Sequence, residues 1–114
     1  MKIENLRTEK RGDRMAALAT VTWEDSDRPR QELFFETDAA YAESLSSNPN
    51  AFLLACAIPA LHFKERRVYL EDAVCPELVD GLTTAMHWLR SWYYEPERKI
   101  VTIEARKRTV SQIL

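Results

Sequence analysis

Cys75 is the residue whose type and setting come closest to a reactive group. It directly precedes Pro76 and a long stretch with helical periodicity, so its thiol is expected at a helix N-terminus, where the helix dipole favours the thiolate. Glu71, Asp72 and Glu77 surround it with negative charge, which opposes the thiolate. These four residues form the candidate reactive or ligand-binding site, and a small thiol-dependent enzyme is the alternative hypothesis for function.

The acidic residues of this site also permit a second chemistry. Two carboxylates held close together can share the roles of general acid and general base. Asp80 extends the acidic set along the same predicted helix start, where negative charge is stabilised by the helix dipole without any catalytic role. That structural benefit is sufficient to explain the set, and we assign no catalytic residue.

Cofactor and metal motifs are missing from the sequence. Gly12 and Gly81 are its only glycines, so it has neither a phosphate-binding loop nor a dinucleotide fingerprint. Its two cysteines, Cys56 and Cys75, are not spaced as zinc ligands, and Cys56 lies inside an apolar run as a small core residue. We therefore expect no cofactor and no metal.

Length and composition are typical of one folded domain spanning residues 1–114. A net charge of −2 gives no bulk attraction to nucleic acid or anionic lipid, and the basic run 106–108 is expected to be solvated. The opening segment "MKIENLRTEKRGDR" is polar throughout and is no signal peptide, so we expect a cytoplasmic protein. The apolar run Ala51 to Leu61 is too short to span a membrane.

Two strands are predicted in the first third of the chain. In "MAALATVTWED" apolar residues alternate with threonines, and "QELFFET" places Leu33 and Phe35 on one face and Phe34 on the other. The turn-rich segment between them predicts a hairpin. A short helix is expected over "AAYAESLSS", with Thr37 or Asp38 as its cap.

Two longer helices are predicted downstream. Asn48 and Pro49 are start signals for a helix over the apolar run, which we expect to be buried on several sides and to kink or end at Pro59. From Pro76 to about Tyr94, apolar residues recur at helical spacing. The strands "RRVYLED" and "IVTIEA" flank this second helix and predict a crossover unit with parallel strands. The fold class is thus α+β, a two-layer domain in which helices cover one face of a mixed sheet built from the hairpin and a βαβ unit.

Three aromatic residues are candidates for an interface. Trp88 and Trp92 lie one helical turn apart, and an exposed pair of this kind suits a protein interface, although such residues are more often part of the core. Phe34 lies among Glu32 and Glu36, facing a partner or a covering element. A homodimer or another protein partner would use these side chains; binding of nucleic acid and of membranes is not expected, and no small-molecule ligand is indicated.

The motifs "ETD…NPNAFLLACAIPAL", "VYLEDAVCPELVDGL…AMHWLRSW" and "VTIEA" resemble the N-terminal region of a group of bacterial proteins. In that group the C-terminal part resembles PP-loop ATP pyrophosphatases, the superfamily of asparagine synthase and the 7-cyano-7-deazaguanine synthases. The resemblance covers roughly Trp23 to Ala105. The family's Ser-Gly-Gly-x-Asp-Ser loop follows the equivalent of "VTIEA", whereas here only "RKRTVSQIL" follows, so no catalytic residue carries over.

These observations favour a non-catalytic domain that acts by binding. The resemblance implies an accessory or assembly domain associated with an adenylating enzyme of the PP-loop type, either as a short protein or as part of a longer one with an ATP-binding half.

Overall fold

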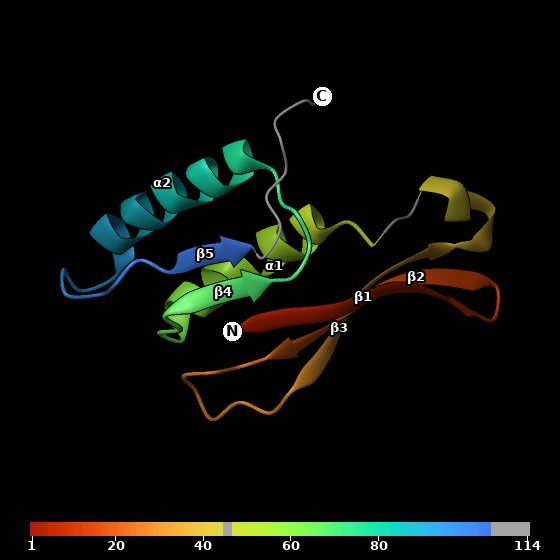
Figure 1. Ribbon diagram of the computed structural model, residues 1–114, viewed down its shortest axis with the longest axis horizontal. Coiled ribbons are helices and arrows are strands. Elements are labelled where there is room, and N and C mark those ends of the chain that lie inside the picture. Colours follow the sequence, from red (N-terminus) through yellow and green to blue (C-terminus); the bar gives the residue numbers. More distant parts are fainter. Residues whose placement is uncertain (45–46, 106–114) are drawn as a thin grey trace.

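The computed structural model of the chain describes residues 1–44 and 47–105 (Figure 1). Its elements, in chain order, are β1 (Lys2–Arg11), β2 (Arg14–Thr22), β3 (Gln31–Asp38), a 3-10 helix (Ala39–Ser44), α1 (Pro49–His62), β4 (Arg67–Leu70), α2 (Pro76–Tyr93) and β5 (Thr102–Ala105). The strands of this part form one mixed sheet in the order β3-β2-β1-β4-β5. β1, β2 and β3 pair antiparallel, whereas β4 pairs in parallel with both β1 and β5.

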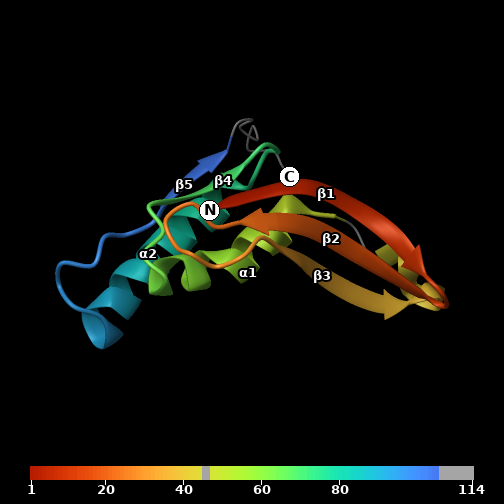
Figure 2. The ribbon, with the colours of Figure 1, turned by 90° about the horizontal axis from the view of Figure 1, so that it is seen from below.

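Both α-helices lie on the same side of the sheet (Figure 2). α1 packs against β1, β4 and α2, so the core lies between the sheet and the helix layer. Val68 and Leu70 project from β4 into this core, while Tyr69 between them is only partly buried. The predicted α+β two-layer domain is confirmed, including the β2–β3 hairpin and the parallel strands on either side of α2.

The predicted helix starts are also confirmed. The side chain of Asn48 accepts a hydrogen bond from the backbone N–H of Asn50 at 2.9 Å, and Pro49 occupies the first turn, where its missing N–H has no cost. Cys75 precedes α2 with an extended backbone, again followed by proline, although its side chain makes no capping hydrogen bond.

The N-terminal segment, for which the sequence predicted no strand, forms β1 at the centre of the sheet. A tight turn joins it to β2, and Gly12 adopts a φ of +64° there, a conformation in which a side chain would be strained. The register shifts between Glu4 and Arg7, with Asn5 at a φ of 56° in the resulting bulge. Ile3 is the single buried residue of β1, which explains why this strand has no clear apolar alternation.

The expectations for the apolar run were partly wrong. α1 continues beyond Pro59 to His62, because the proline is exposed near the helix end, where water can satisfy the carbonyl that it leaves unpaired. The helix is buried on one side only, and the side chain of Leu54 on the other side is 57% exposed. The short helix expected over residues 39–47 is a 3-10 helix that ends at Ser44; residues 45 and 46 lie outside the described part of the chain.

A buried carboxylate connects the sheet to the segment that follows β2. Glu65 is 2% exposed and accepts hydrogen bonds from the backbone N–H groups of Glu24 at 2.9 Å and Asp25 at 2.8 Å. The amino group of Met1 forms an ion pair with the same carboxylate at 2.6 Å. A buried charge is tolerated only when it is paired and hydrogen-bonded, and Glu65 meets both conditions.

An arginine joins this network from β4. Arg67 donates two hydrogen bonds to Glu24, from Nε and Nη2, each of 3.0 Å. These bonds, with a smaller contribution from the amino group of Met1, lower the pKa of Glu24 to about 2. The start of β4 is therefore held to the end of β2 by side chains as well as by the sheet.

Replacing Glu65 with glutamine is expected to lower the free energy of unfolding by about 2 kcal/mol, because an amide cannot accept from both N–H groups and balance the buried ammonium. Urea denaturation followed by tryptophan fluorescence measures the change. Glu97→Gln is the matched control, since Glu97 is exposed and should change stability by no more than about 0.5 kcal/mol. Equal midpoints for the two variants would contradict this account of Glu65.

Acid should weaken the fold through Glu24. Its pKa is lowered in the folded state from an ordinary value of 4.5 to about 2, so its contribution is complete above pH 4.5 and is lost as the pH falls toward 2. The thermal midpoint of the wild type should fall more steeply between pH 5 and pH 2.5 than that of Glu24→Gln, which lacks this titration. Parallel pH profiles from differential scanning calorimetry would refute the assignment.

Candidate functional site

Cys75 joins the starts of the two α-helices. Its backbone N–H donates to Oδ1 of Asn50 at 2.7 Å, and its carbonyl accepts from Leu78 and Val79 in the first turn of α2. The residue is partly buried. These contacts give Cys75 a structural role in positioning α2 against α1, one that needs only its backbone.

The acidic residues of the candidate reactive site surround the same helix start. Glu71 and Asp72 lie in the bend after β4, and Glu77 lies in the first turn of α2; all three are exposed. Within residues 1–44 and 47–105, no three potential metal ligands come together. The structure therefore keeps these residues close to Cys75 along the chain without arranging them around a buried reaction centre.

The second thiol lies in the core, as the sequence predicted. Cys56 is 5% exposed between α1 and the sheet, and burial raises its pKa to about 11. Because the thiolate is the reactive form, this cysteine is inert in the folded protein. Any thiol chemistry of the folded domain would have to come from Cys75.

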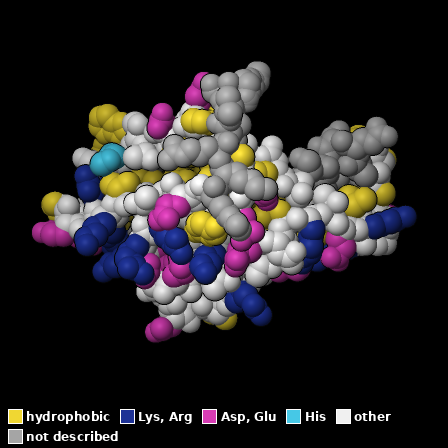
Figure 3. All heavy atoms as spheres, in the orientation of Figure 1, with side chains coloured by type: hydrophobic (Ala, Val, Ile, Leu, Met, Phe, Trp, Pro, Cys, Tyr) yellow, Lys and Arg dark blue, Asp and Glu magenta, His cyan; other side chains and the backbone are white. Residues whose placement is uncertain are grey.

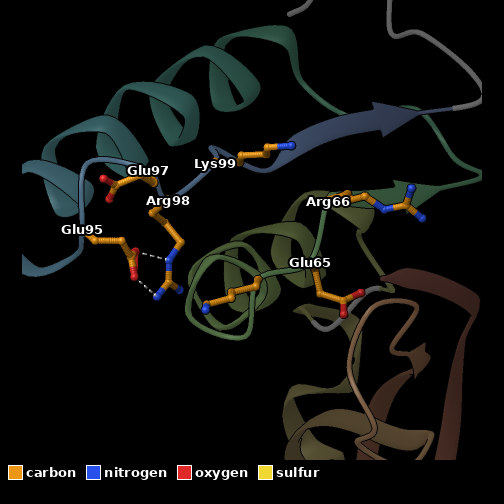
Figure 4. Close-up of a pocket in the computed structure, with 7 residues that line it drawn as sticks. Glu65, Arg66, Glu95, Glu97, Arg98 and Lys99 are labelled. Atoms are coloured by element: carbon orange, nitrogen blue, oxygen red, sulfur yellow. Dashed lines mark hydrogen bonds and ion pairs between the residues drawn. The ribbon is translucent and has the colours of Figure 1, made fainter.

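A hollow of about 280 Å³ opens between the α1–β4 turn and the segment before β5 (Figure 4). Sequence patterns did not predict it, because its lining residues come from two separate segments: Lys64, Glu65, Arg66, Glu95, Glu97, Arg98 and Lys99. In Figure 4 the carboxylate of Glu65 points away from the Glu95–Arg98 pair, toward the network described above. Arg66 is bound to Asp25, so it too is engaged within the fold.

Arg98 is the organising side chain of this hollow. Its guanidinium binds both carboxylate oxygens of Glu95, at 2.6 and 2.9 Å, and donates to the backbone carbonyls of Leu61 and His62 at 3.0 Å each. The hydrogen bonds from Arg98 lower the pKa of Glu95. Arg98 thus binds carbonyls at the C-terminal end of α1 and ties them to the segment before β5, which is a structural role.

Trp88 and Trp92 are exposed on α2, so the interpretation of this pair as core residues is wrong. Their side chains are 57% and 64% exposed, and their ring centroids lie 5.5 Å apart. Tyr93, which is 74% exposed, meets the ring of Trp92 edge-on. Hydrophobic side chains project from the α2 region at the upper left of Figure 3. We call Trp88, Trp92 and Tyr93 the aromatic patch.

Phe34 lies on the face of the sheet opposite the helices, as its alternation predicted. It is 49% exposed, and the guanidinium of Arg11 lies 5.3 Å from its ring centroid. Its neighbour Phe35 points toward the helix layer and contacts Phe52, with ring centroids 5.2 Å apart. Phe34 is therefore partly covered by its own chain, in contrast to the aromatic patch.

Comparison of the chain with protein-family models, curated proteins and solved structures gives no match. The resemblance to the N-terminal region of PP-loop proteins stays a prediction. Neither α-helix of the described part has the length and apolarity needed to cross a bilayer.

Thiol labelling should separate the two cysteines. At pH 8 in the native protein, one equivalent of iodoacetamide should react at Cys75, while Cys56 should react at least 100-fold more slowly because it is buried and protonated. Mass spectrometry of timed samples gives both rates. Cys75→Ser should abolish the faster reaction, and labelling of Cys56 at a comparable rate would show that the core opens readily.

Proposed function

We propose that this chain is a non-catalytic binding and assembly domain that acts through the aromatic patch. The observation that carries this proposal is the exposure of three neighbouring aromatic rings, each more than half open to solvent: Trp88 and Trp92 on the outer side of α2, and Tyr93 at the end of the helix, edge-on to Trp92. Tryptophan and tyrosine are enriched in the centres of protein interfaces, where covering them accounts for much of the binding energy.

The patch is held on a rigid support. α2 is an 18-residue helix whose other side buries Leu82 and Met86 in the core. A partner would meet rings whose backbone is already fixed, so little conformational entropy is lost on binding. Because large exposed apolar patches on folded domains mark interaction sites, the domain's composition and its surface favour the same kind of function.

The sequence resemblance suggests what such a domain would assemble. In the family that the chain resembles, the neighbouring part is an enzyme of the PP-loop type. We propose that a PP-loop adenylating enzyme is the protein that this domain organises. The support for this partner is the resemblance alone, whereas the support for binding is the aromatic patch.

The double variant Trp88→Ala/Trp92→Ala tests the proposed function. Both side chains are exposed, so we expect the thermal midpoint to change little, while association of the domain falls at least tenfold because its largest contact area is lost. Light scattering measures association with itself, and titration calorimetry measures binding to a purified PP-loop enzyme. Phe34→Ala is the control on the opposite face. Association that survives in the double variant would refute the proposal.

A further inference from the structure

Gly81 lies in the interior of α2, where nothing in the chain itself requires a glycine. Its backbone is helical, it is exposed, and a Cβ added there would meet no atom within 4 Å other than the adjoining backbone of α2 itself. Glycine inside a helix costs roughly 1 kcal/mol relative to alanine. Neither backbone conformation nor internal packing calls for it, and the missing side chain leaves room on the solvent side of α2.

Gly81 belongs to a row of residues along the solvent side of the helix. At 3.6 residues per turn, positions 81, 84, 88 and 92 fall within a sector of about 80°. Gly81, Thr84, Trp88 and Trp92 are all exposed, and the core-facing residues Leu82 and Met86 point elsewhere. We call these four exposed residues the α2 stripe. Its first two members are small and its last two are tryptophans, the largest type of side chain.

We propose that the α2 stripe binds the α2 stripe of a second copy of this chain, with the two helices antiparallel. This inference rests on the proposed function and names its first partner. In a two-fold symmetric interface the same surface must be complementary to itself. With the axis midway between Thr84 and Trp88, each Trp88 faces the other copy's Thr84, and each Trp92 lies within one residue, about 1.5 Å along the helix axis, of the other copy's Gly81. Large side chains then occupy the space that small ones leave.

The two tryptophans supply part of the area that a stable dimer buries. An aromatic side chain buries roughly 150–250 Å² when it is covered. Trp88 and Trp92, the two rings of the α2 stripe, are 57% and 64% exposed. They therefore offer on the order of 250 Å² per copy, about a third of the roughly 800 Å² that each partner contributes to a standard interface. The remaining area would come from the flanks of the two helices, which approach to roughly 8–10 Å between axes.

The exposed edge of the sheet is less suited to a second copy. Antiparallel pairing of two β3 strands centred on Phe34 would place Glu32 opposite the other copy's Glu36. Like charges directly opposite each other destabilise a strand pair. These carboxylates are already bound to arginines of their own sheet, Glu32 to Arg7 and Arg11 and Glu36 to Arg14. The stripe has no charged residue at its centre and meets no such conflict.

Gly81→Gln distinguishes a loss of dimerisation from a loss of folding stability. Glutamine is a good helix former, so the variant should raise the thermal midpoint of the dilute protein. Its side chain would occupy the space assigned to the other copy's Trp92, so the dissociation constant of the dimer should rise at least tenfold. Lys10→Gln is the matched control, since Lys10 is exposed on β1, outside α2 and its flanks. It should leave the dissociation constant unchanged.

Light scattering and sedimentation velocity across a concentration series give these constants. A wild-type dimer that is weakened by Gly81→Gln and by Trp88→Ala/Trp92→Ala, but not by Lys10→Gln, supports the inference. A wild type that stays monomeric up to roughly 0.5 mM, where even a dimer with a dissociation constant near 1 mM would be partly populated, or a dimer indifferent to Gly81→Gln, overturns it. In either of those cases the proposed function still stands if, among the variants, only Trp88→Ala/Trp92→Ala loses binding to a purified PP-loop enzyme. If the double variant keeps that binding, the proposed function and the proposed dimer both fail.

Discussion

The buried carboxylate of Glu65 is the interaction on which the arrangement of the two halves of the sheet depends. It lies just before β4 and receives two backbone N–H groups from the segment after β2, together with the amino group of Met1. An unpaired charge at a site this dry would be strongly unfavourable, so β1, the end of β2 and the start of β4 must come together in one geometry. The α1–β4 turn and the hollow beside it follow from that constraint.

Much of the fold was predictable because local signals agree with the tertiary structure. Asn48 with Pro49, and Cys75 with Pro76, mark helix starts that the structure reproduces. β1 could not be predicted in the same way. Its neighbours in the sheet provide its backbone hydrogen bonds, while only Ile3 is buried and its other side chains are partly or fully exposed. β1 is then a strand because of its place between β2 and β4, and its sequence shows no clear alternation of apolar and polar residues.

The candidate site was less accessible to sequence reasoning. Trp88 and Trp92 recur at helical spacing, and the frequency with which tryptophan is buried suggested a core position. A signal was present, because Leu82 and Met86 define the core side of the helix and the tryptophans fall outside that sector. Glu65 had no such signal, since nothing in a sequence distinguishes a solvated glutamate from one whose partners arrive from segments far along the chain.

The parallel seam between β1 and β4 governs how quickly the chain can reach its native topology. Only Lys2 with Tyr69 and Ile3 with Leu70 are in register there, and the contacting residues are separated by more than half of the chain. Closing so long a loop is entropically costly before any contact compensates for it, whereas β1, β2 and β3 join through short connections. We therefore expect β1, β2 and β3 to pair early in folding and the contact between β1 and β4 to form late. β1 takes part in both steps, because it pairs with β2 on one side and with β4 on the other.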